Sequence, residues 1–217
     1  MPTILIPVKH LDQAKGRLGD LVDDSDRRAL ALAMLEDVIS QTVLWPTVTV
    51  TGDPTVASLC RSRGCEVIDD PGAGLNRAID TATATLKDET ESLLVIPADV
   101  PLVASSDITS LFSIDAEVLV VGSADRGTNA FLRRPPQAID AAFGDGSAKA
   151  HCDSAEARGL TWQMVTMPSL TLDVDDAEDL LSLARSDADR RSVALAKQIV
   201  ASKGWRLGPF DDAYPHP

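Results

Sequence analysis

Cysteine and aromatic residues are scarce in this chain. Its 217 residues include 3 cysteines, and neither their odd number nor their spacing supports a disulfide framework or a zinc knuckle. We therefore expect reduced thiols and a cytoplasmic location. Aromatic residues make up 4% of the sequence, so the core must be built from Ala, Leu, Val and Ile, which suits helices packed on a buried parallel sheet.

Long apolar runs and an excess of positive charge are absent as well. No run approaches the roughly 18 apolar residues of a membrane span, and residues 3–8 are too short and too poorly flanked by basic residues for a signal peptide. With 20 basic and 33 acidic residues, the formal net charge is −13, which would repel a nucleic-acid backbone. The sequence therefore argues against both a membrane and a nucleic-acid partner.

The remaining composition is that of a globular protein that can bury a core, with 44% hydrophobic and 24% charged residues. At about 150 residues per domain, the length predicts one domain. We place it at residues 1–203, and we interpret residues 204–217, which are rich in proline and aromatic residues, as a C-terminal tail.

Strand-like and helix-like patterns alternate along the first 121 residues. We expect strands over residues 3–8, 47–51, 65–68, 93–96 and 117–121, and helices from a cap at Ser25 and over residues 55–63, 75–86 and 107–111. Strands separated by helices pair in parallel through crossover connections, which place helices on both faces of a sheet. The pattern predicts an α/β fold, namely a three-layer sandwich with a mostly parallel sheet.

The alternation changes after residue 121. Residues 128–133 and 161–167 are typical of strands, residues 138–143 of a helical turn, and residues 147–158 of a helix. We interpret this part as an insertion that adds antiparallel strands and a lobe over a site. Two helices, over residues 176–184 and 190–202, are expected to close the domain.

The loop after the first strand lacks the common nucleotide fingerprints. It contains neither Gly-x-Gly-x-x-Gly nor a Gly-Lys-Ser/Thr ending, which disfavours a dehydrogenase or a P-loop kinase. The loop is basic instead, because Lys9, Lys15 and Arg17 fall within nine residues. Positive charge beside the carboxyl end of a strand is where an open α/β sheet binds anions, although solvated surface charges are the alternative interpretation.

A carboxylate follows the strand over residues 93–96. Asp99 at its end can hold Mg²⁺ on a triphosphate. The same side chain could instead cap the next helix, but Ser105 and Ser106 are better placed for that role. We favour the metal.

A second acidic segment precedes the helix over residues 176–184. Asp173 and Asp175 alternate along an extended stretch, so both can face one site. Acidic residues also stabilise the first turn of a helix, and this explains Asp176, Glu178 and Asp179 better than it explains Asp173.

Glycine-rich turns supply further candidates. The turns over residues 70–76, 125–129 and 143–147 combine glycines with hydroxyl or amide side chains, and their backbone N–H groups suit phosphate or carboxylate binding. Taken singly, each is more commonly an ordinary turn. The chain has no Gly-x-Ser-x-Gly elbow and its 3 histidines have no metal-ligand spacing, so covalent catalysis has little support.

In order and spacing, several of these motifs resemble the guanylyltransferases of deazaflavin coenzyme (F-420) biosynthesis, which activate 2-phospho-L-lactate or phosphoenolpyruvate with GTP. The motifs are Ile6-Pro-Val-Lys9, Ala14-Lys15-Gly-Arg17-Leu18, Gly74-Leu-Asn76, Pro97-Ala-Asp99-Val-Pro101, Gly127-Thr128-Asn129, Phe143-Gly144-x-Gly-Ser147-x-x-x-His151 and Asp173-Val-Asp175, within residues 3–180. The resemblance implies the single-domain nucleotidyltransferase fold of molybdenum-cofactor guanylyltransferases and sugar-nucleotide synthases.

The resemblance also implies a reaction. GMP would move from GTP to the phosphate of phosphoenolpyruvate or 2-phospho-L-lactate, with 3-phosphoglycerate as a third candidate, and pyrophosphate would be released. By the match, Mg²⁺ is the cofactor, held by Asp99 with Asp173 or Asp175, and the phospho-acid is held by Thr128, Gly144 and Ser147. A downstream transferase of the same pathway is a further candidate partner.

Charge completes the expected site. We expect the nucleotide to contact Lys9, Lys15, Arg17, Gly74 and Asn76, with Lys15, Arg17 and Asp99 as the catalytic group. A phosphomonoester has a second pKa near 6, so the acceptor is already an ionised nucleophile at neutral pH and needs no general base.

Two positions depart from the family pattern. Ala148 stands where we expect an aromatic residue after Ser147, which leaves the three-carbon acid open, and Asp176-Ala177 replaces the common Thr-Pro. Among the alternatives, other nucleotidyltransferases of the same fold would need a Gly-Gly-rich first loop, which is absent. A non-catalytic nucleotide-binding module would need neither Asp99 nor a second carboxylate.

Overall fold

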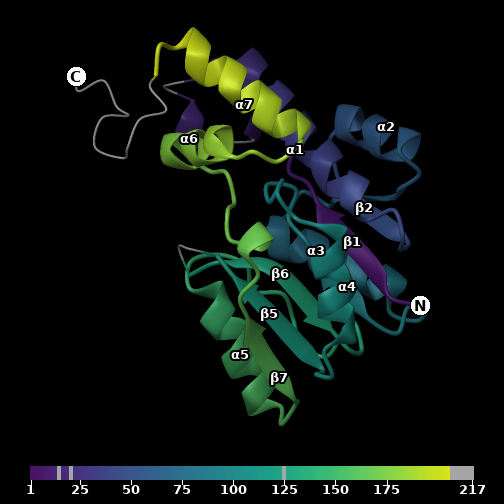
Figure 1. The fold of residues 1–217 in the computed structure, drawn as a ribbon. Helices are drawn as coiled ribbons and strands as arrows, with labels where there is room; N and C mark the ends of the chain where they lie inside the picture. Colours follow the sequence, from purple (N-terminus) through teal and green to yellow (C-terminus); the bar gives the residue numbers. More distant parts are fainter. Residues whose placement is uncertain (14–15, 20–21, 124–125, 206–217) are drawn as a thin grey trace.

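The computed structural model describes residues 1–13, 16–19, 22–123 and 126–205, and within them one seven-stranded sheet carries helices on both faces (Figure 1). The strands are β1 (Thr3–Pro7), β2 (Thr47–Thr51), β3 (Glu66–Asp69), β4 (Leu93–Val95), β5 (Val118–Gly122), β6 (Thr128–Arg133) and β7 (Trp162–Val165). The helices are α1 (Asp24–Gln41), α2 (Pro54–Ser62), α3 (Leu75–Leu86), α4 (Ser105–Ser113), α5 (Ser147–Ala157), α6 (Ala177–Arg185) and α7 (Arg191–Ser202), with short 3-10 helices η1 (Leu11–Gln13), η2 (Gly16–Leu18) and η3 (Pro168–Leu170). The predicted three-layer α/β sandwich is confirmed.

The strands follow the order β3-β2-β1-β4-β6-β5-β7. Neighbouring strands are parallel except at β6, which runs antiparallel to both β4 and β5. Antiparallel neighbours need only a short connection, whereas parallel neighbours need a crossover, so the short segment between β5 and β6 suffices. The predicted antiparallel insertion is therefore one strand of the sheet. Because β6 is reversed, its first residue, Thr128, lies at the edge where the parallel strands end.

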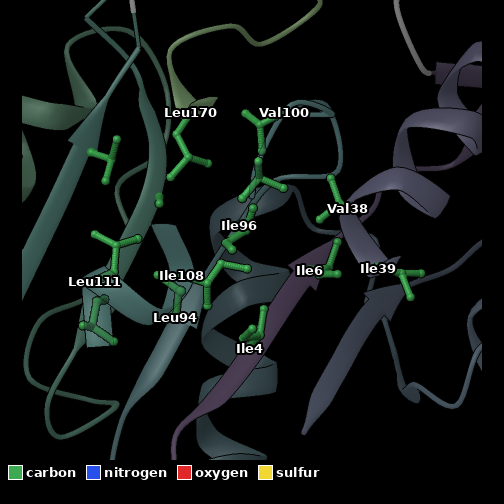
Figure 2. Packing of buried hydrophobic residues seen from close by; sticks show 14 of the residues in the cluster. Ile4, Ile6, Val38, Ile39, Leu94, Ile96, Val100, Ile108, Leu111 and Leu170 are labelled. Carbon is green, nitrogen blue, oxygen red and sulfur yellow. The ribbon is translucent and has the colours of Figure 1, made fainter. Parts of the chain in front are cut away.

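Successive residues of β1 face the two helical layers. Ile4 and Ile6 pack with α1, α2 and α4, and Figure 2 shows them beside Val38 of α1 and Leu94 of β4. Leu5 packs on the other face, with α3 and α5. These three β1 side chains are fully buried, and burying such a side chain is worth roughly 1.5–3 kcal/mol, so the alternation fixes which helices cover which face.

Helices α6 and α7 form a third apolar cluster with α1, away from the sheet (Figure 1). Leu30 and Met34 of α1 belong to this cluster, while Leu35 and Val38 face the sheet. The helix α1 is thus buried on two sides. By packing there, α6 brings the chain segment that precedes it back to the edge of the sheet.

The carboxylate of Asp37 joins the first helix to the last. It accepts the backbone N–H of Arg191 at 3.0 Å and that of Ser192 at 2.8 Å, and it is 5% exposed. The N-cap residue of α7, Arg190, makes no side-chain cap of its own. A residue of α1 therefore caps α7.

Two predicted helix caps are wrong. Asp23 caps α1 by accepting a backbone N–H three residues later, and Ser25 lies inside that helix. Helix α4 begins at Ser105 after the N-cap residue Ala104, which makes no side-chain cap, so neither Ser105 nor Ser106 caps it. Ser25 lies two residues after the true cap, and because both Asp and Ser are typical N-cap residues, the sequence pattern alone does not separate them.

The predicted helical turn over residues 138–143 is also wrong, because the chain there has two bends followed by backbone without regular secondary structure. Side chains, rather than preceding carbonyls, bind the N–H groups of Ala142 and Phe143. The domain boundary at residue 203 and the separate tail stay predictions, since residues 206–217 lie outside the described part of the chain. Among the described helices, none is long and apolar enough to cross a membrane.

Candidate active site

Two neighbouring cavities open at the edge where β1, β2 and β4 end. The first, of about 140 Å³, is lined by Lys9, Asp99 and Asp175 together with apolar residues from α1 and the loop after β4. The second, of about 230 Å³, is lined by Lys9 as well, and by the glycine-rich segment around Gly74 and the carboxylate of Asp70. We call them the Asp99 cavity and the Gly74 cavity. Ligands of open α/β sheets bind at this edge.

A backbone hydrogen bond brings Asp99 and Asp175 to one cavity. The N–H of Val174 donates to the carbonyl oxygen of Asp99 at 3.0 Å, which ties the segment before α6 to the loop after β4. Val174 is fully buried in the cluster of α1, α6 and α7. The sequence prediction that a carboxylate of the 173/175 pair lies with Asp99 agrees with this geometry.

Asp173 has different neighbours. The side-chain amide of Asn129, in β6, donates to Asp173 Oδ1 at 3.2 Å and to the carbonyl oxygen of Leu170 at 2.8 Å. The segment of residues 171–176 is not a strand. Asp175 therefore lines the Asp99 cavity, while Asp173 is held against β6.

The acidic residues that follow stabilise the start of α6, as expected. Asp176 accepts the N–H groups of Glu178 and Asp179, and the Asp179 carboxylate accepts those of Asp175 and Asp176 at 2.9 and 3.1 Å. Burial raises the pKa of Asp179, and these two N–H donors counteract it. This capping box fixes the backbone of Asp175 at the site.

The predicted cationic residues are described only in part. Lys9 lines both cavities, because it follows the carboxyl end of β1, where both of them open. Lys15 and the side chain of Arg17 lie outside the described residues, although the backbone of Arg17 belongs to η2. Their contacts with a triphosphate stay predictions.

Asp53 anchors the loop that carries Lys9, and our sequence interpretation had given it no role. Its carboxylate accepts the N–H groups of Leu11, Thr55 and Val56 at 2.9, 2.8 and 3.2 Å and lies 3.3 Å from His10 Nδ1. Burial would raise the pKa of Asp53, but the combined effect of these N–H donors and His10 holds it below its usual value. An Asp directly before a Pro is typical of a helix N-cap and could have revealed it.

The two predicted residues of α3 have separate roles. Gly74 lines the Gly74 cavity and begins α3 with a φ of 94°, a conformation that L side chains rarely adopt. Asn76 uses both amide atoms on Phe143, donating to its carbonyl oxygen at 3.0 Å and accepting its N–H at 2.7 Å. Asn76 therefore supports the Phe143–Ser147 turn, and its predicted contact with the nucleotide stays a prediction.

The predicted phospho-acid residues form one cluster. Thr128 Oγ1 lies 2.9 Å from Ser147 Oγ, and the N–H of Ser147 donates to the carbonyl oxygen of Gly144 at 3.1 Å. Ser147 is the first residue of α5, so the N-terminal end of that helix dipole faces the same turn. Thr128 is 5% exposed and Ser147 is 1% exposed, so their hydroxyls lie under the turn rather than on the open surface.

His151 belongs to the same cluster, and spacing alone had given it no role. Its Nδ1 lies 3.2 Å from Thr128 Oγ1, its Nε2 accepts the N–H of Ala142 at 2.9 Å, and its ring stacks on Phe131 with centroids 4.0 Å apart. Burial, and secondly the charge of Arg133, lower the pKa of His151 to about 4. The ring is neutral at neutral pH.

Strand register brings the cluster to the same edge of the sheet as the Asp99 cavity. Val95 in β4 pairs with Phe131 in β6, and the two strands run in opposite directions. Continuing past Val95 toward Asp99 therefore leads along β6 back toward Asn129 and Thr128. One edge of the sheet thus carries both the cavity lined by Lys9, Asp99 and Asp175 and the buried hydroxyls of Thr128 and Ser147.

The donor set of the Asp99 cavity suits Mg²⁺. This ion takes one or two carboxylates from a protein and completes its shell with water and phosphate oxygens. Asp99 and Asp175 supply the two carboxylates. In the described ranges, no group of three or more His, Cys, Asp or Glu side chains is arranged to hold a metal ion.

Comparisons with known proteins agree with this geometry. The family model described as "Guanylyl transferase CofC like" matches residues 2–203. A phosphoenolpyruvate guanylyltransferase of Roseiflexus sp. (strain RS-1) is 33% identical over 98% of each chain. A 3-phospho-D-glycerate guanylyltransferase of Colwellia psychrerythraea is 32% identical over 83% of this chain and 90% of its own.

Solved structures share the fold at low sequence identity. A provisionally named nucleotide-diphospho-sugar transferase from Desulfovibrio desulfuricans G20 superimposes with a TM-score of 0.79 at 15% identity, over 94% of this chain and 96% of its own. A cytidylyltransferase from Leptospira borgpetersenii gives a TM-score of 0.58 at 13% identity, over 100% and 98%. With a family model over nearly the whole chain, the assignment is plain: the chain belongs to the CofC-like guanylyl transferases and is a nucleotidyltransferase.

Proposed function

We propose that this enzyme transfers GMP from GTP to the phosphate of a small phospho-acid and releases pyrophosphate. Phosphoenolpyruvate is the first candidate acceptor, with 2-phospho-L-lactate and 3-phosphoglycerate as alternatives, because the names of the relatives include two of the three. The observation that carries the proposal is that the Thr128 and Ser147 hydroxyls lie at the same edge of the sheet as a cavity lined by Lys9, Asp99 and Asp175.

The chemistry needs positioning more than proton transfer. One ionised oxygen of the acceptor phosphate attacks the α-phosphorus of GTP, a new P–O bond forms, and the bond to the bridging oxygen breaks so that pyrophosphate leaves with the electron pair. The acceptor oxygen is already deprotonated at neutral pH, which agrees with the neutral, hydrogen-bonded state of His151. Holding two polyanions together supplies most of the rate enhancement.

Each group in the described chain has a place in that scheme. Lys9 lies where it can contact phosphates in either cavity, and Gly74 admits a ligand close to the backbone. The hydroxyls of Thr128 and Ser147, with the N-terminus of α5, would bind the acceptor phosphate. Mg²⁺ bound by Asp99 and Asp175 would neutralise negative charge on the triphosphate.

A substrate panel tests the proposal. Protein, Mg²⁺, each of the four nucleoside triphosphates and each of the three phospho-acids are combined, and pyrophosphate release is measured. We expect release with GTP and at least one acceptor, and none when Mg²⁺ is removed by a chelator. Equal rates with all four triphosphates, or no release with any acceptor, would contradict the proposal.

The Asp99→Ala variant tests whether this carboxylate takes part in the reaction. Loss of a metal-binding carboxylate should lower turnover by about a hundredfold or more, since such a clamp contributes several kcal/mol to the transition state. Thermal unfolding should change little, because Asp99 is not part of the apolar core. A loss of tenfold or less with normal unfolding would remove Asp99 from the reaction.

The cellular setting is part of the same proposal. Membership of this family supports a role in coenzyme F-420 biosynthesis, with a downstream transferase that consumes the guanylylated acid. Three free and buried cysteines, Cys60, Cys65 and Cys152, support a reducing, cytoplasmic location.

A further inference from the structure

We infer that His151, held in its Nδ1–H tautomer, is a positioning residue that orients the Thr128–Ser147 pair and keeps it a net hydrogen-bond donor toward the acceptor phosphate. The inference rests on the proposed function and goes beyond it, because it assigns a direction to each hydrogen bond in the cluster. It also explains why a histidine lies at a site that needs no general base. Three hydrogen bonds link Ala142, His151, Thr128 and Ser147 in a row.

The backbone of Ala142 selects the tautomer of His151. An amide nitrogen can only donate, and the Ala142 N–H points at His151 Nε2 from 2.9 Å, so Nε2 carries a lone pair. A neutral imidazole has one ring proton, which must then be on Nδ1. The fixed backbone thus determines which ring nitrogen can donate.

The protonated Nδ1 donates to Thr128 Oγ1, 3.2 Å away. Thr128 and Ser147 share a second hydrogen bond of 2.9 Å, in which either hydroxyl can be the donor. The three groups hold three protons between them, and the two internal hydrogen bonds use two. One hydroxyl proton is therefore left for an acceptor outside the cluster, whichever hydroxyl donates internally.

The opposite tautomer would reverse this outcome. With a lone pair on Nδ1, Thr128 would donate to the ring and Ser147 would donate to Thr128, so no proton would remain for a ligand. The cluster would then present lone pairs to an anion and repel it. The N–H of Ala142 therefore acts through His151 on the phosphate site.

Burial strengthens the effect. His151, Ser147 and Thr128 are 0%, 1% and 5% exposed, so water has little access to satisfy the remaining hydroxyl proton. A buried donor without an acceptor is costly, and an anionic oxygen forms a stronger hydrogen bond with it than a neutral group does. Within the described part of the chain, Ser147 Oγ has no hydrogen-bond partner besides Thr128. A phosphate oxygen supplies the acceptor that the cluster lacks.

The packing around His151 holds its ring in place. The ring stacks on Phe131 at 4.0 Å and meets Phe143 edge-on at 5.4 Å. Asn76 fixes the backbone of Phe143, next to Ala142. Asn76 thus fixes the backbone that carries the Ala142 N–H, and Phe131 and Phe143 fix the His151 ring. The tautomer is therefore preserved without any ligand.

The first test measures the tautomer directly. The protein is labelled with ¹⁵N-histidine, and the ring nitrogen shifts of His151 are measured at pH 7.5 without ligand, assigned by their loss in His151→Phe. We expect the shifts of an Nδ1–H ring. The shifts of an Nε2–H ring or of a doubly protonated ring would overturn the inference, whatever the enzyme's substrates are.

The second test separates positioning from packing. His151→Phe keeps an aromatic ring against Phe131 but removes both polar contacts. The two hydroxyls keep one spare proton, but they lose the N–H that orients Thr128, and the Ala142 N–H loses its acceptor. The acceptor KM should therefore rise about tenfold while the GTP KM changes less than about threefold. His151→Asn keeps an N–H donor near Thr128 and should recover part of the loss. Phe131→Leu removes the stacking contact but leaves both hydrogen bonds of His151 in place, and should raise the acceptor KM by less than His151→Phe does.

Each outcome has a defined meaning. Equal rises of the acceptor KM in His151→Phe and Phe131→Leu would show that the ring only fills space, and would overturn the inference. If no acceptor gives pyrophosphate, the proposed function fails, and titration with inorganic phosphate takes the place of kinetics. The backbone amide signal of Ser147 should then shift at a lower phosphate concentration in the original protein than in His151→Phe, and equal concentrations would overturn the inference. The absence of a shift in both would also overturn the inference.

Discussion

Acidification should destabilise this protein through His151. The pKa of His151 is about 4 in the folded protein, against 6.5 for a free side chain. Between these two pH values, His151 is therefore protonated in the unfolded chain and neutral in the folded chain. Stability from this residue is complete above pH 6.5 and declines as the pH falls toward 4. Between pH 7.5 and pH 5 we expect a loss of about 2 kcal/mol in the free energy of unfolding from this group.

The variant His151→Phe isolates the contribution. Other groups titrate in both proteins, so they cancel in the difference between the two free energies of unfolding. Urea denaturation followed by circular dichroism, at pH 7.5 and at pH 5, should show that this difference shrinks by about 2 kcal/mol on acidification. A difference that stays constant would refute the reasoning, because it would mean that the ring is accessible to protons or is already charged in the folded state.

Further predictions concern the site and the last helix. Asp175→Ala should lower the rate of pyrophosphate release far more than Asp173→Ala and should raise the Mg²⁺ concentration needed for half-maximal rate, since Asp175 lines the cavity; similar losses would contradict this. Arg17→Ala should raise the KM for GTP more than that for the acceptor, and Ser147→Ala should do the reverse, as initial rates with each substrate varied would show. Asp37→Ala should lower the free energy of unfolding by about 1–2 kcal/mol in a urea titration, with turnover per folded molecule unchanged.

Local sequence patterns predicted most of the helices and strands. The predicted helix over residues 75–86 and the strands over residues 47–51 and 128–133 coincide with α3, β2 and β6. Each has strong periodicity and a clear boundary, such as the glycine before α3. The reversal of β6 followed from the break in the alternation of strands and helices. These features depend on neighbouring residues alone, which is why one sequence sufficed.

Side-chain contacts between residues far apart in the chain could not be predicted from the sequence. Ala142 and Phe143 look like part of a helical turn because their partners, His151 and Asn76, come from other elements. Asp37 gave no signal at all, since a carboxylate in the middle of α1 resembles any polar helix position. Spacing placed Asp173 and Asp175 on one face, but it could not show that Asn129 holds one of them. Such contacts are fixed by tertiary packing, which no local period encodes.

The cap that Asp37 provides has a consequence for synthesis in the cell. The carboxylate lies in the first helix, and the two N–H groups that it accepts lie 154 and 155 residues later. While the chain emerges from the ribosome, this side of α1 must stay hydrated and unpaired until α7 has been made. The sheet strands and their covering helices precede α7 in the chain, so the edge of the sheet that carries both cavities can form first and the cluster of α1, α6 and α7 last.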